Sequence, residues 1–373
     1  MKKIIIIFML INIFILPSYA ANVDEYYEEQ LEASGAKELS DYLSDETKDY
    51  LGKLGYSDIE FEKMLEASPG AVFGLIGEIT KNGIKTPLKG LLTASGTVLL
   101  VSVCSAFFPD DEKSRIVLNI ISGCILVTGI FIPASEALKA AVSVIEACCD
   151  FEKGLIPVLT GVVAVSGNPV MSLTYKGAAF AAAEFISAFG KNFALPLAGI
   201  SGALGITGAM MPTLRLSAVS DMIRKTMTTA LSSAAGLFTG FLALKGVLSS
   251  SADGIAAKGV RLAANTFIPV IGGAIGEAYS SVMGSLSLLK NTVVIYAVAA
   301  FFLICIPVII NLALWVISLR AAGTLSDLID CRVCSEILRN ISFVFSMINT
   351  LLLLCMAVFV ISTGLVAAIK TGG

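Results

Sequence analysis

The residues that could do chemistry in this chain are few, because its 373 residues include no histidine. Without histidine, the commonest general base is missing, and so are the nucleophile triads that depend on it. The sequence also contains no phosphate-binding loop, zinc-protease motif, nucleophile elbow or dinucleotide-binding fingerprint. We therefore expect that the chain is not an enzyme and that it binds no cofactor.

Eight cysteines remain. Cys104, Cys124, Cys305 and Cys355 lie inside apolar runs, where a thiol behaves as a small hydrophobic side chain. One CxxC pair stands in a polar stretch, at Cys331 and Cys334. A zinc site would need a second pair or histidines, so we predict no metal site. Whether the pair has a redox role or belongs to an ordinary loop stays open.

Glu184, Lys191 and Glu277 are ionisable residues within long apolar stretches. Such residues are costly inside a bilayer and are functional candidates by default when they occur there. Glu184 and Lys191 are seven residues apart, so they share one helix face and could pair across two turns. The alternatives are a structural ion pair or a segment end near the lipid headgroups.

The composition indicates a membrane protein. Hydrophobic residues make up 56% of the chain and charged residues 15%, and the mean hydropathy is +0.85. Soluble domains carry about 45–50% apolar and about 25% charged residues. We predict an all-α, polytopic integral membrane helical bundle with six to eight spans, which contacts the lipid bilayer. A basic stripe suited to nucleic acid is absent, which excludes that class of partner.

The N-terminal part differs from the rest. Residues 1–20 have a basic start, an apolar run of 13 residues and a small-x-small end, which predicts a cleaved signal peptide. An uncleaved anchor is the alternative, but the run is short for about 30 Å of hydrocarbon. Residues 21–85 then hold 15 acids and 6 lysines, a net −9. We interpret residues 21–87 as a small extracytoplasmic helical region, with a solvated acidic tail as the alternative.

The remaining chain divides into membrane segments. Residues 88–135 are predicted to form a transmembrane hairpin and residues 136–153 an interfacial helix. Residues 154–249 and 262–368 then resemble each other as repeats A and B. Residues 155–171 align without gaps on residues 267–283, with identities that include Pro157 with Pro269 and Gly161 with Gly273. Each copy continues with an apolar segment containing a central proline, a polar linker and a last span, which indicates an internal duplication.

The first segment of each repeat carries residues that are unusual for a span. One holds Ser166, Asn168 and a proline near its middle, and the other holds several glycines and serines around Glu277. Broken segments at bilayer depth require protein or a water-filled cavity around them, and paired ones point to a transport path. A kinked helix packed through its glycines is the alternative. The candidate pore or packing residues are Pro157, Gly161, Ser166, Asn168, Glu184, Lys191, Pro269, Gly273, Gly276, Glu277 and Ser280.

The span count depends on these segments. If both cross the membrane there are eight spans, and if both are re-entrant there are six. In the six-span arrangement the two polar linkers, residues 214–223 and 319–329, lie on the same side. The arginines then fall mostly inside, as the positive-inside rule favours, whereas the lysines do not discriminate.

Two stretches resemble the stage III sporulation protein AE family. They are Arg261-Leu262-Ala263-Ala264-Asn265-Thr266-Phe267-Ile268-Pro269-Val270 and Ser287-Leu288-Leu289-Lys290-Asn291-Thr292-Val293. Ser68-Pro69 and Asn82-Gly83 match the same pattern near the first span. Gly272-Gly273 and Glu277 depart from the family's serine-rich segment, which leaves the side chains of that region in question.

The resemblance implies a role and no reaction. Members of this family belong to a mother-cell membrane complex that contains further membrane and ATPase components. It works with a forespore membrane partner across the intermembrane space. The resemblance thus implies a multi-pass protein of the mother-cell membrane around the forespore, acting as a channel or export-gate-like subunit needed for forespore development. The alternatives are a self-contained secondary transporter or permease and a non-conducting scaffold of the same complex.

Overall fold

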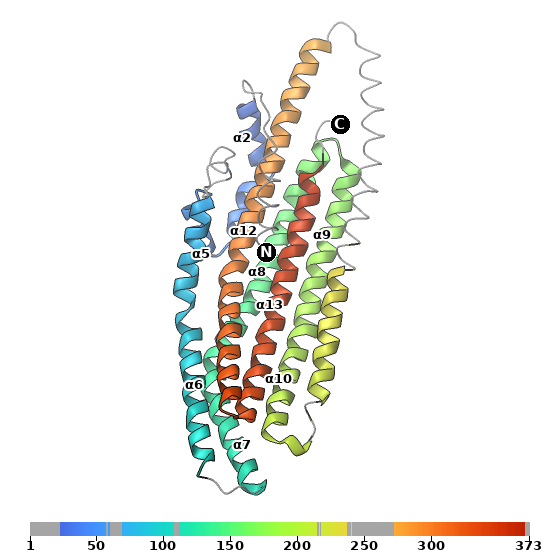
Figure 1. The fold of residues 1–373 in the computed structure, drawn as a ribbon. Helices are drawn as coiled ribbons and strands as arrows, with labels where there is room; N and C mark the ends of the chain where they lie inside the picture. The colour runs from blue at the N-terminus through green and yellow to red at the C-terminus, as the bar shows by residue number, and fades with distance from the viewer. Residues whose placement is uncertain are drawn as a thin grey trace.

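The structure is a computed structural model that describes residues 23–56, 59, 69–107, 112–214, 216, 218–236, 240 and 272–369. These residues form helices and connecting turns without any strand, so the predicted all-α fold is confirmed. The helices pack side by side into one elongated bundle (Figure 1). Its elements are α2 (Val23–Ala33), η1 (Ala36–Tyr42), α3 (Asp45–Lys53), α5 (Pro69–Gly83), α6 (Lys85–Ser105), α7 (Glu112–Leu126), η2 (Val127–Phe131), α8 (Ile132–Val165), α9 (Pro169–Phe189), η3 (Gly190–Ala194), α10 (Leu195–Met210), η4 (Pro212–Leu214), α12 (Gly272–Leu328) and α13 (Arg332–Ala367).

Five helical segments of the described chain are long and apolar enough to cross a membrane. They are Lys85–Ser105, Lys113–Ile130, Pro169–Met210, Val282–Leu328 and Arg332–Ala367. Together with the high mean hydropathy, these segments identify a membrane protein. Residues 218–236 form a further helix that returns from the lower end of α10 (Figure 1).

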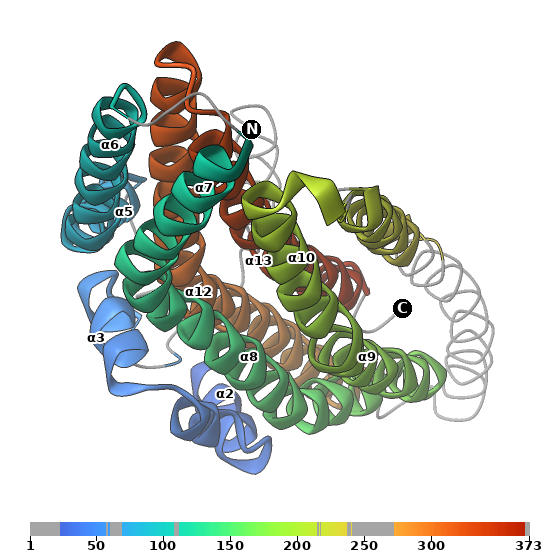
Figure 2. The ribbon, with the colours of Figure 1, turned by 90° about the horizontal axis from the view of Figure 1, so that it is seen from below.

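The core of the bundle is built around α12 and α13. These helices run antiparallel and are joined by a tight turn at the lower end (Figure 1). The Phe301 and Phe359 rings stack with their centroids 3.8 Å apart, and Phe151 of α8 contacts Phe359 at 6.3 Å. Figure 2, a view along the bundle, shows α8 beside α12, with α9, α10 and α13 continuing around the same axis. Aromatic side chains therefore fill the space where α8, α12 and α13 meet.

Several helix crossings depend on glycine. A Cβ atom at Gly90 of α6 would lie 2.4 Å from the Trp315 ring of α12, and one at Gly205 of α10 would lie 2.5 Å from Asn340 of α13. Within a bilayer, helices associate through close van der Waals packing, and small residues permit that approach. The glycine content is thus partly explained by packing.

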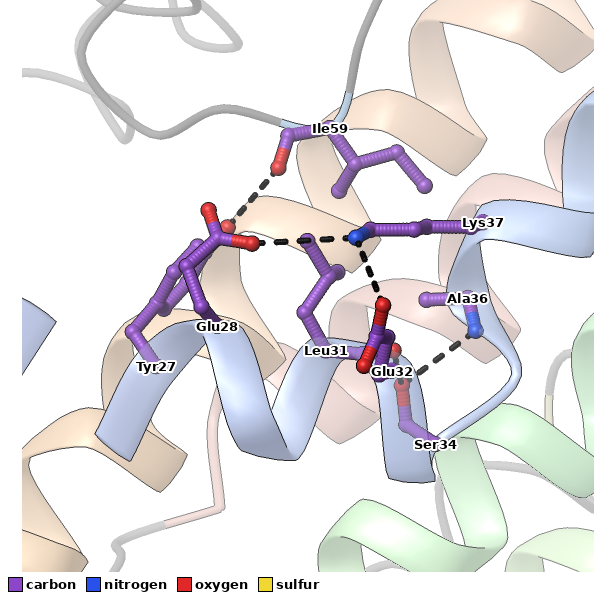
Figure 3. A network of polar contacts seen from close by, with 8 residues as sticks. All are labelled: Tyr27, Glu28, Leu31, Glu32, Ser34, Ala36, Lys37 and Ile59. Atoms are coloured by element: carbon purple, nitrogen blue, oxygen red, sulfur yellow. Dashed lines mark hydrogen bonds and ion pairs between the residues drawn. The ribbon is translucent and has the colours of Figure 1, made fainter. Parts of the chain in front are cut away.

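The acidic N-terminal region is folded onto the bundle. Leu39 and Leu51 are almost fully buried, and Ser285 of α12 donates a hydrogen bond of 2.9 Å to the Gln30 side chain. Within the region, Tyr27 donates to the Ile59 carbonyl at 2.9 Å, and Lys37 lies 3.6–3.7 Å from Glu28 and Glu32 (Figure 3). A free, solvated tail is therefore excluded for the described residues of this region.

Residues 136–153, the expected interfacial helix, are part of a longer helix. They form the middle of α8, which continues α7 through the π-helical turn η2. Ala141, Ile145 and Cys148 are buried at helical intervals, and the Cys148 sulfur lies 3.2 Å from that of Cys305 on α12. This apolar stripe packs inside the bundle, and the interfacial position of the opposite face stays a prediction.

The two repeats differ where both were expected to be broken. The first break is present, because α8 ends at Val165 and α9 begins at Pro169. The second copy is a continuous helix from Gly272 onward. Asn168 precedes a proline, which disfavours helical backbone at that residue, whereas no proline follows Ser280. Glycine and serine alone do not end a helix.

Both polar linkers lie at the lower end of the bundle (Figure 1). Ser220 donates to the Ser201 carbonyl at 3.1 Å, and the Arg224 guanidinium lies 4.6 Å from the Phe343 ring centre. The second linker ends at the α12–α13 turn, where Asp327 pairs with Arg339. This is the arrangement that the six-span alternative requires, while the span count itself stays a prediction. Residues 1–22 and 241–271, which include the signal peptide and Pro269, lie outside the described residues.

Candidate functional site

A cavity of about 390 Å³ lies between the acidic region and the bundle. Its volume falls in the range of about 300–1,000 Å³ that small-molecule sites occupy. Its lining comes from α3, the α5–α6 junction, the start of α8 and the middle of α12. The residues that give it chemical character are Glu46, Tyr50, Asn82, Glu136, Pro307 and Asn311.

Asn311 brings a buried acceptor without a hydrogen-bond donor to the wall of the cavity. Its Oδ1 atom is buried and accepts no hydrogen bond from any residue that the structure describes. Buried polar atoms are almost always hydrogen-bonded, and an orphaned one costs about 1–3 kcal/mol. One helical turn earlier, Pro307 removes the backbone donor for the Leu303 carbonyl. The wall that α12 contributes to the cavity is thus locally poor in hydrogen bonds.

The opposite wall is acidic. Tyr50 donates a hydrogen bond of 2.8 Å to the Glu46 carboxylate. Burial raises the pKa of Tyr50 to about 12, and this hydrogen bond adds to the effect. Glu136, at the start of α8, supplies a second carboxylate. The lining is therefore rich in acceptors, and it suits a ligand or peptide segment that carries amine, amide or hydroxyl donors.

The cavity is lined by carboxylate, amide, hydroxyl and apolar side chains. No group of three or more cysteine, aspartate or glutamate residues among them converges into a metal site. Each carboxylate of the cavity is acceptor-only when ionised, and the lining includes no cysteine or serine nucleophile. The geometry of this cavity suits binding.

The structure separates the sequence-predicted site residues of α8 from the cavity. Pro157 and Gly161 lie one turn apart on the exposed face of α8, and nothing lies within 4 Å of a Cβ atom placed at Gly161. Ser166 is buried and donates to the Val162 carbonyl at 2.6 Å. Asn168 lies at the start of α9 and donates to the Ser166 carbonyl at 3.2 Å. In this chain these residues form a helix hairpin, and a role of theirs in a transport path stays a prediction.

The suggested pairing of Glu184 with Lys191 differs from the one observed. Lys191 forms its ion pair with Glu146 of α8, at 2.8 Å, and Glu184 is exposed on α9. The π-helical turn η3, which begins at Gly190, offsets Lys191 from the regular helix face that it would otherwise share with Glu184. Gly273, Gly276, Glu277 and Ser280 lie in the first turns of α12, where only the backbone is described.

The chain is similar in sequence to one known protein family. The family model described as stage III sporulation protein AE matches residues 53–370. This stretch covers most of the chain, including the cavity residues on α5, α6, α8 and α12.

The chain belongs to the stage III sporulation protein AE family. Membership places it among sporulation proteins. The stage III sporulation protein AE of Bacillus subtilis (strain 168) is 29% identical to it over 195 residues. That match covers 52% of this chain and 48% of the relative, so it spans about half of the relative's length. No solved structure matches the chain.

Two residues that carried the resemblance to the stage III sporulation protein AE family line the cavity. They are Asn82 and Gly83, at the junction of α5 and α6. A Cβ atom at Gly83 would lie 3.7 Å from the Asn311 amide nitrogen, so this junction packs directly against the orphaned amide. The sequence pattern pointed to the junction, but only the fold brings it to α12.

Lys290 belongs to the second stretch that resembles the family, and in this chain it has a structural role. It is almost fully buried, and its ammonium donates to the Ala367 carbonyl at 3.3 Å and to the Ile369 carbonyl. The last carbonyls of a helix have no partner within it, and a cation at that end is favourable. Lys290 thus caps α13 from α12.

Sequence reasoning missed Glu152 of α8, which is only 3% exposed. No hydrogen bond or ion pair joins it to another residue in the described part of the chain. Burial raises its pKa to about 8. Its helical spacing among apolar residues is typical of the polar side of an interfacial helix, so no pattern in the sequence indicated its burial.

Proposed function

We propose that this chain is a membrane-embedded, export-gate-like subunit of a sporulation-specific complex between mother cell and forespore, needed for forespore development. The observation that carries the proposal is the length of the bundle in a member of this family. At 1.5 Å per residue, the 57 residues of α12 extend about 85 Å, whereas the hydrocarbon core of a bilayer is about 30 Å thick. A large part of the bundle therefore projects beyond the membrane, with the acidic region packed along it.

The projecting part is suited to meet other components. In this proposal the acidic region faces the intermembrane space, and the lower end, which includes Arg320, Arg332 and Arg339, faces the mother-cell cytoplasm under the positive-inside rule. Membrane and ATPase components of the complex would then contact the lower end and the bundle. The forespore membrane partner would be reached from the upper end.

In this proposal the cavity is a binding site at which no covalent bond is made or broken. Its acceptor-rich lining would receive donor groups of a translocated substrate or of a partner segment at the junction of membrane bundle and acidic region. The aromatic filling between α8, α12 and α13 supports a conduit formed with other subunits over one within a single chain. Neither feature requires a bond to be made or broken, which supports a non-enzymatic role.

Variants of the cavity test the proposal in a sporulating host. Asn311→Leu and Glu136→Gln should lower the yield of heat-resistant spores while the amount of the protein in the membrane stays unchanged. Glu184→Gln, on the exposed face of α9, is the matched control and should sporulate as the unmodified chain does. Wild-type spore yields from both cavity variants would refute a working role of the cavity.

Reconstitution distinguishes the two alternatives. The purified chain in liposomes should release no small solutes alone, because the proposed conduit needs other subunits. Solute release by the chain alone would favour a self-contained transporter. The scaffold alternative holds under three results together. The cavity variants sporulate normally, the purified chain releases no solute, and deletion of the chain still prevents assembly of the complex.

A further inference from the structure

The turn between α12 and α13 brings two cysteines together at a helix start. Cys331 is the N-cap residue of α13 and is partly exposed, whereas Cys334 lies in the first turn and is fully buried. The N-cap residue and the residue three positions later face each other across the first turn, as in a capping box. One thiol is thus open to solvent, and the other lies directly behind it.

The backbone holds Cys331 in this position. The Ser326 hydroxyl donates to the Cys331 carbonyl at 2.7 Å, and the Cys331 amide donates to the Ser326 carbonyl at 2.9 Å. Asp330 completes the turn with a φ of 56°, a left-handed conformation that aspartate adopts more readily than most residues. The Asp327–Arg339 ion pair closes the turn between the two helices.

The surroundings favour a thiolate at Cys331. The neighbouring Cys334 thiol lowers the pKa of Cys331 below that of an ordinary thiol, despite partial burial. The start of a 36-residue helix adds the positive end of its dipole. Asp330 opposes the effect, but its carboxylate lies 3.5 Å from the Arg332 guanidinium, which offsets its charge.

We propose that Cys331 and Cys334 form a thiol–disulfide exchange site, with Cys331 as the attacking thiolate and Cys334 as the resolving thiol, and with a low-molecular-weight disulfide as oxidant. The Cys331 thiolate attacks one sulfur of the disulfide, forms a mixed disulfide and releases the first thiolate. Cys334 passes its proton to that leaving thiolate, attacks the Cys331 sulfur and releases the second thiolate, which takes the proton that Cys331 had lost. The pair is oxidised by two electrons, and the disulfide is reduced to two thiols.

The geometry permits the final bond. Helix residues three apart have Cβ atoms about 5–6 Å apart, and a disulfide needs about 3.5–4.5 Å. Cys331 stands at the cap with φ −90° and ψ 74°, outside the regular helix, so we expect a rotation at this residue to bring the two sulfurs within bonding distance. Closure would change the backbone that the Ser326 hydrogen bonds now hold, which links the redox state to the α12–α13 turn.

The sequence between the cysteines supplies a direct assay. Trypsin cleaves after Arg332, so residues 321–332 and 333–339 separate when the thiols are reduced and stay linked when a disulfide joins them. The full-length chain, in detergent, is incubated with oxidised glutathione, alkylated, digested and analysed by mass spectrometry without reduction. We expect the linked peptide pair to appear with glutathione disulfide and to disappear after dithiothreitol.

Two single variants assign the roles. Cys334→Ser should accumulate a glutathione adduct on Cys331, because the resolving thiol is missing. Cys331→Ser should acquire little adduct on the buried Cys334, and both variants should keep the helical circular dichroism of the unmodified chain. Absence of the linked peptides, or equal adduct formation in the two variants, would overturn the proposal.

Discussion

The crossing of α6 and α12 offers a sharp test of the packing. Gly90 lies under the Trp315 ring, and a Cβ atom there would be 2.4 and 2.7 Å from two of its ring carbons. Ordinary van der Waals contacts are about 3.5–4.0 Å, so alanine would overlap the ring by about 1 Å. Trp315 is only 1% exposed, and a fully packed indole cannot rotate away easily.

The size of the effect follows from two opposing contributions. Overpacking of this kind costs about 1–3 kcal/mol. Alanine in place of glycine within a helix otherwise gains about 0.5–1 kcal/mol. Gly96, on the same helix, has nothing within 4 Å of its added Cβ, so Gly96→Ala keeps the gain and avoids the clash. The gain is common to both variants, so they should differ by the cost of the clash alone, about 1–3 kcal/mol in the free energy of unfolding.

The assay is the unfolding of the purified chain in a mild detergent, followed by circular dichroism. Gly90→Ala should unfold at a lower temperature than the unmodified chain, and Gly96→Ala at the same or a higher temperature. Adding Trp315→Leu to Gly90→Ala should partly restore the lost stability. The coupling energy between these contacting residues should be about 0.5–3 kcal/mol. Equal midpoints for the two alanine variants would show that α6 and α12 do not cross as described.

Two more predictions concern the acidic region and the buried carboxyl. Leu39→Ala should loosen the packing of this region, at a cost of about 2–5 kcal/mol for a large buried side chain. Limited trypsin digestion should then cleave after Lys48 and Lys53 faster than in the exposed control Glu38→Ala, and equal rates would contradict the packing. Glu152→Gln should raise stability at pH 8, because the carboxyl is protonated in the folded state up to a pKa of about 8 and in the unfolded state only up to 4.5. The unmodified chain thus loses stability as the pH rises from 4.5 to 8, by roughly 5 kcal/mol at most. Parallel unfolding profiles of the unmodified chain and Glu152→Gln from pH 5 to 8 would contradict the burial of Glu152.

Local sequence signals predicted the helices and the first break well. Apolar run lengths and composition led to a helical membrane bundle, and Asn168-Pro169 marked the end of α8. The faces of the helices could not be predicted in the same way. In a soluble protein an apolar stripe points inward, but in a bilayer lipid also accepts apolar side chains. Pro157 and Gly161 could therefore be assigned to an interior path when they lie on the exposed face of α8.

Contacts between distant residues were beyond the sequence for a different reason. Lys191 could have paired with any acidic residue on a neighbouring helix, and its partner Glu146 is fixed by how α8 and α9 pack. Lys290 shows the consequence for function. It belongs to the motif that resembles the family, yet its ammonium binds the end of α13, so this part of the motif reports how the bundle closes. A motif in a membrane bundle can thus identify the family without marking its working site. The candidate for the working site of this chain is instead Asn311, whose buried acceptor lacks a hydrogen-bond donor among the described residues beside the Asn82-Gly83 junction.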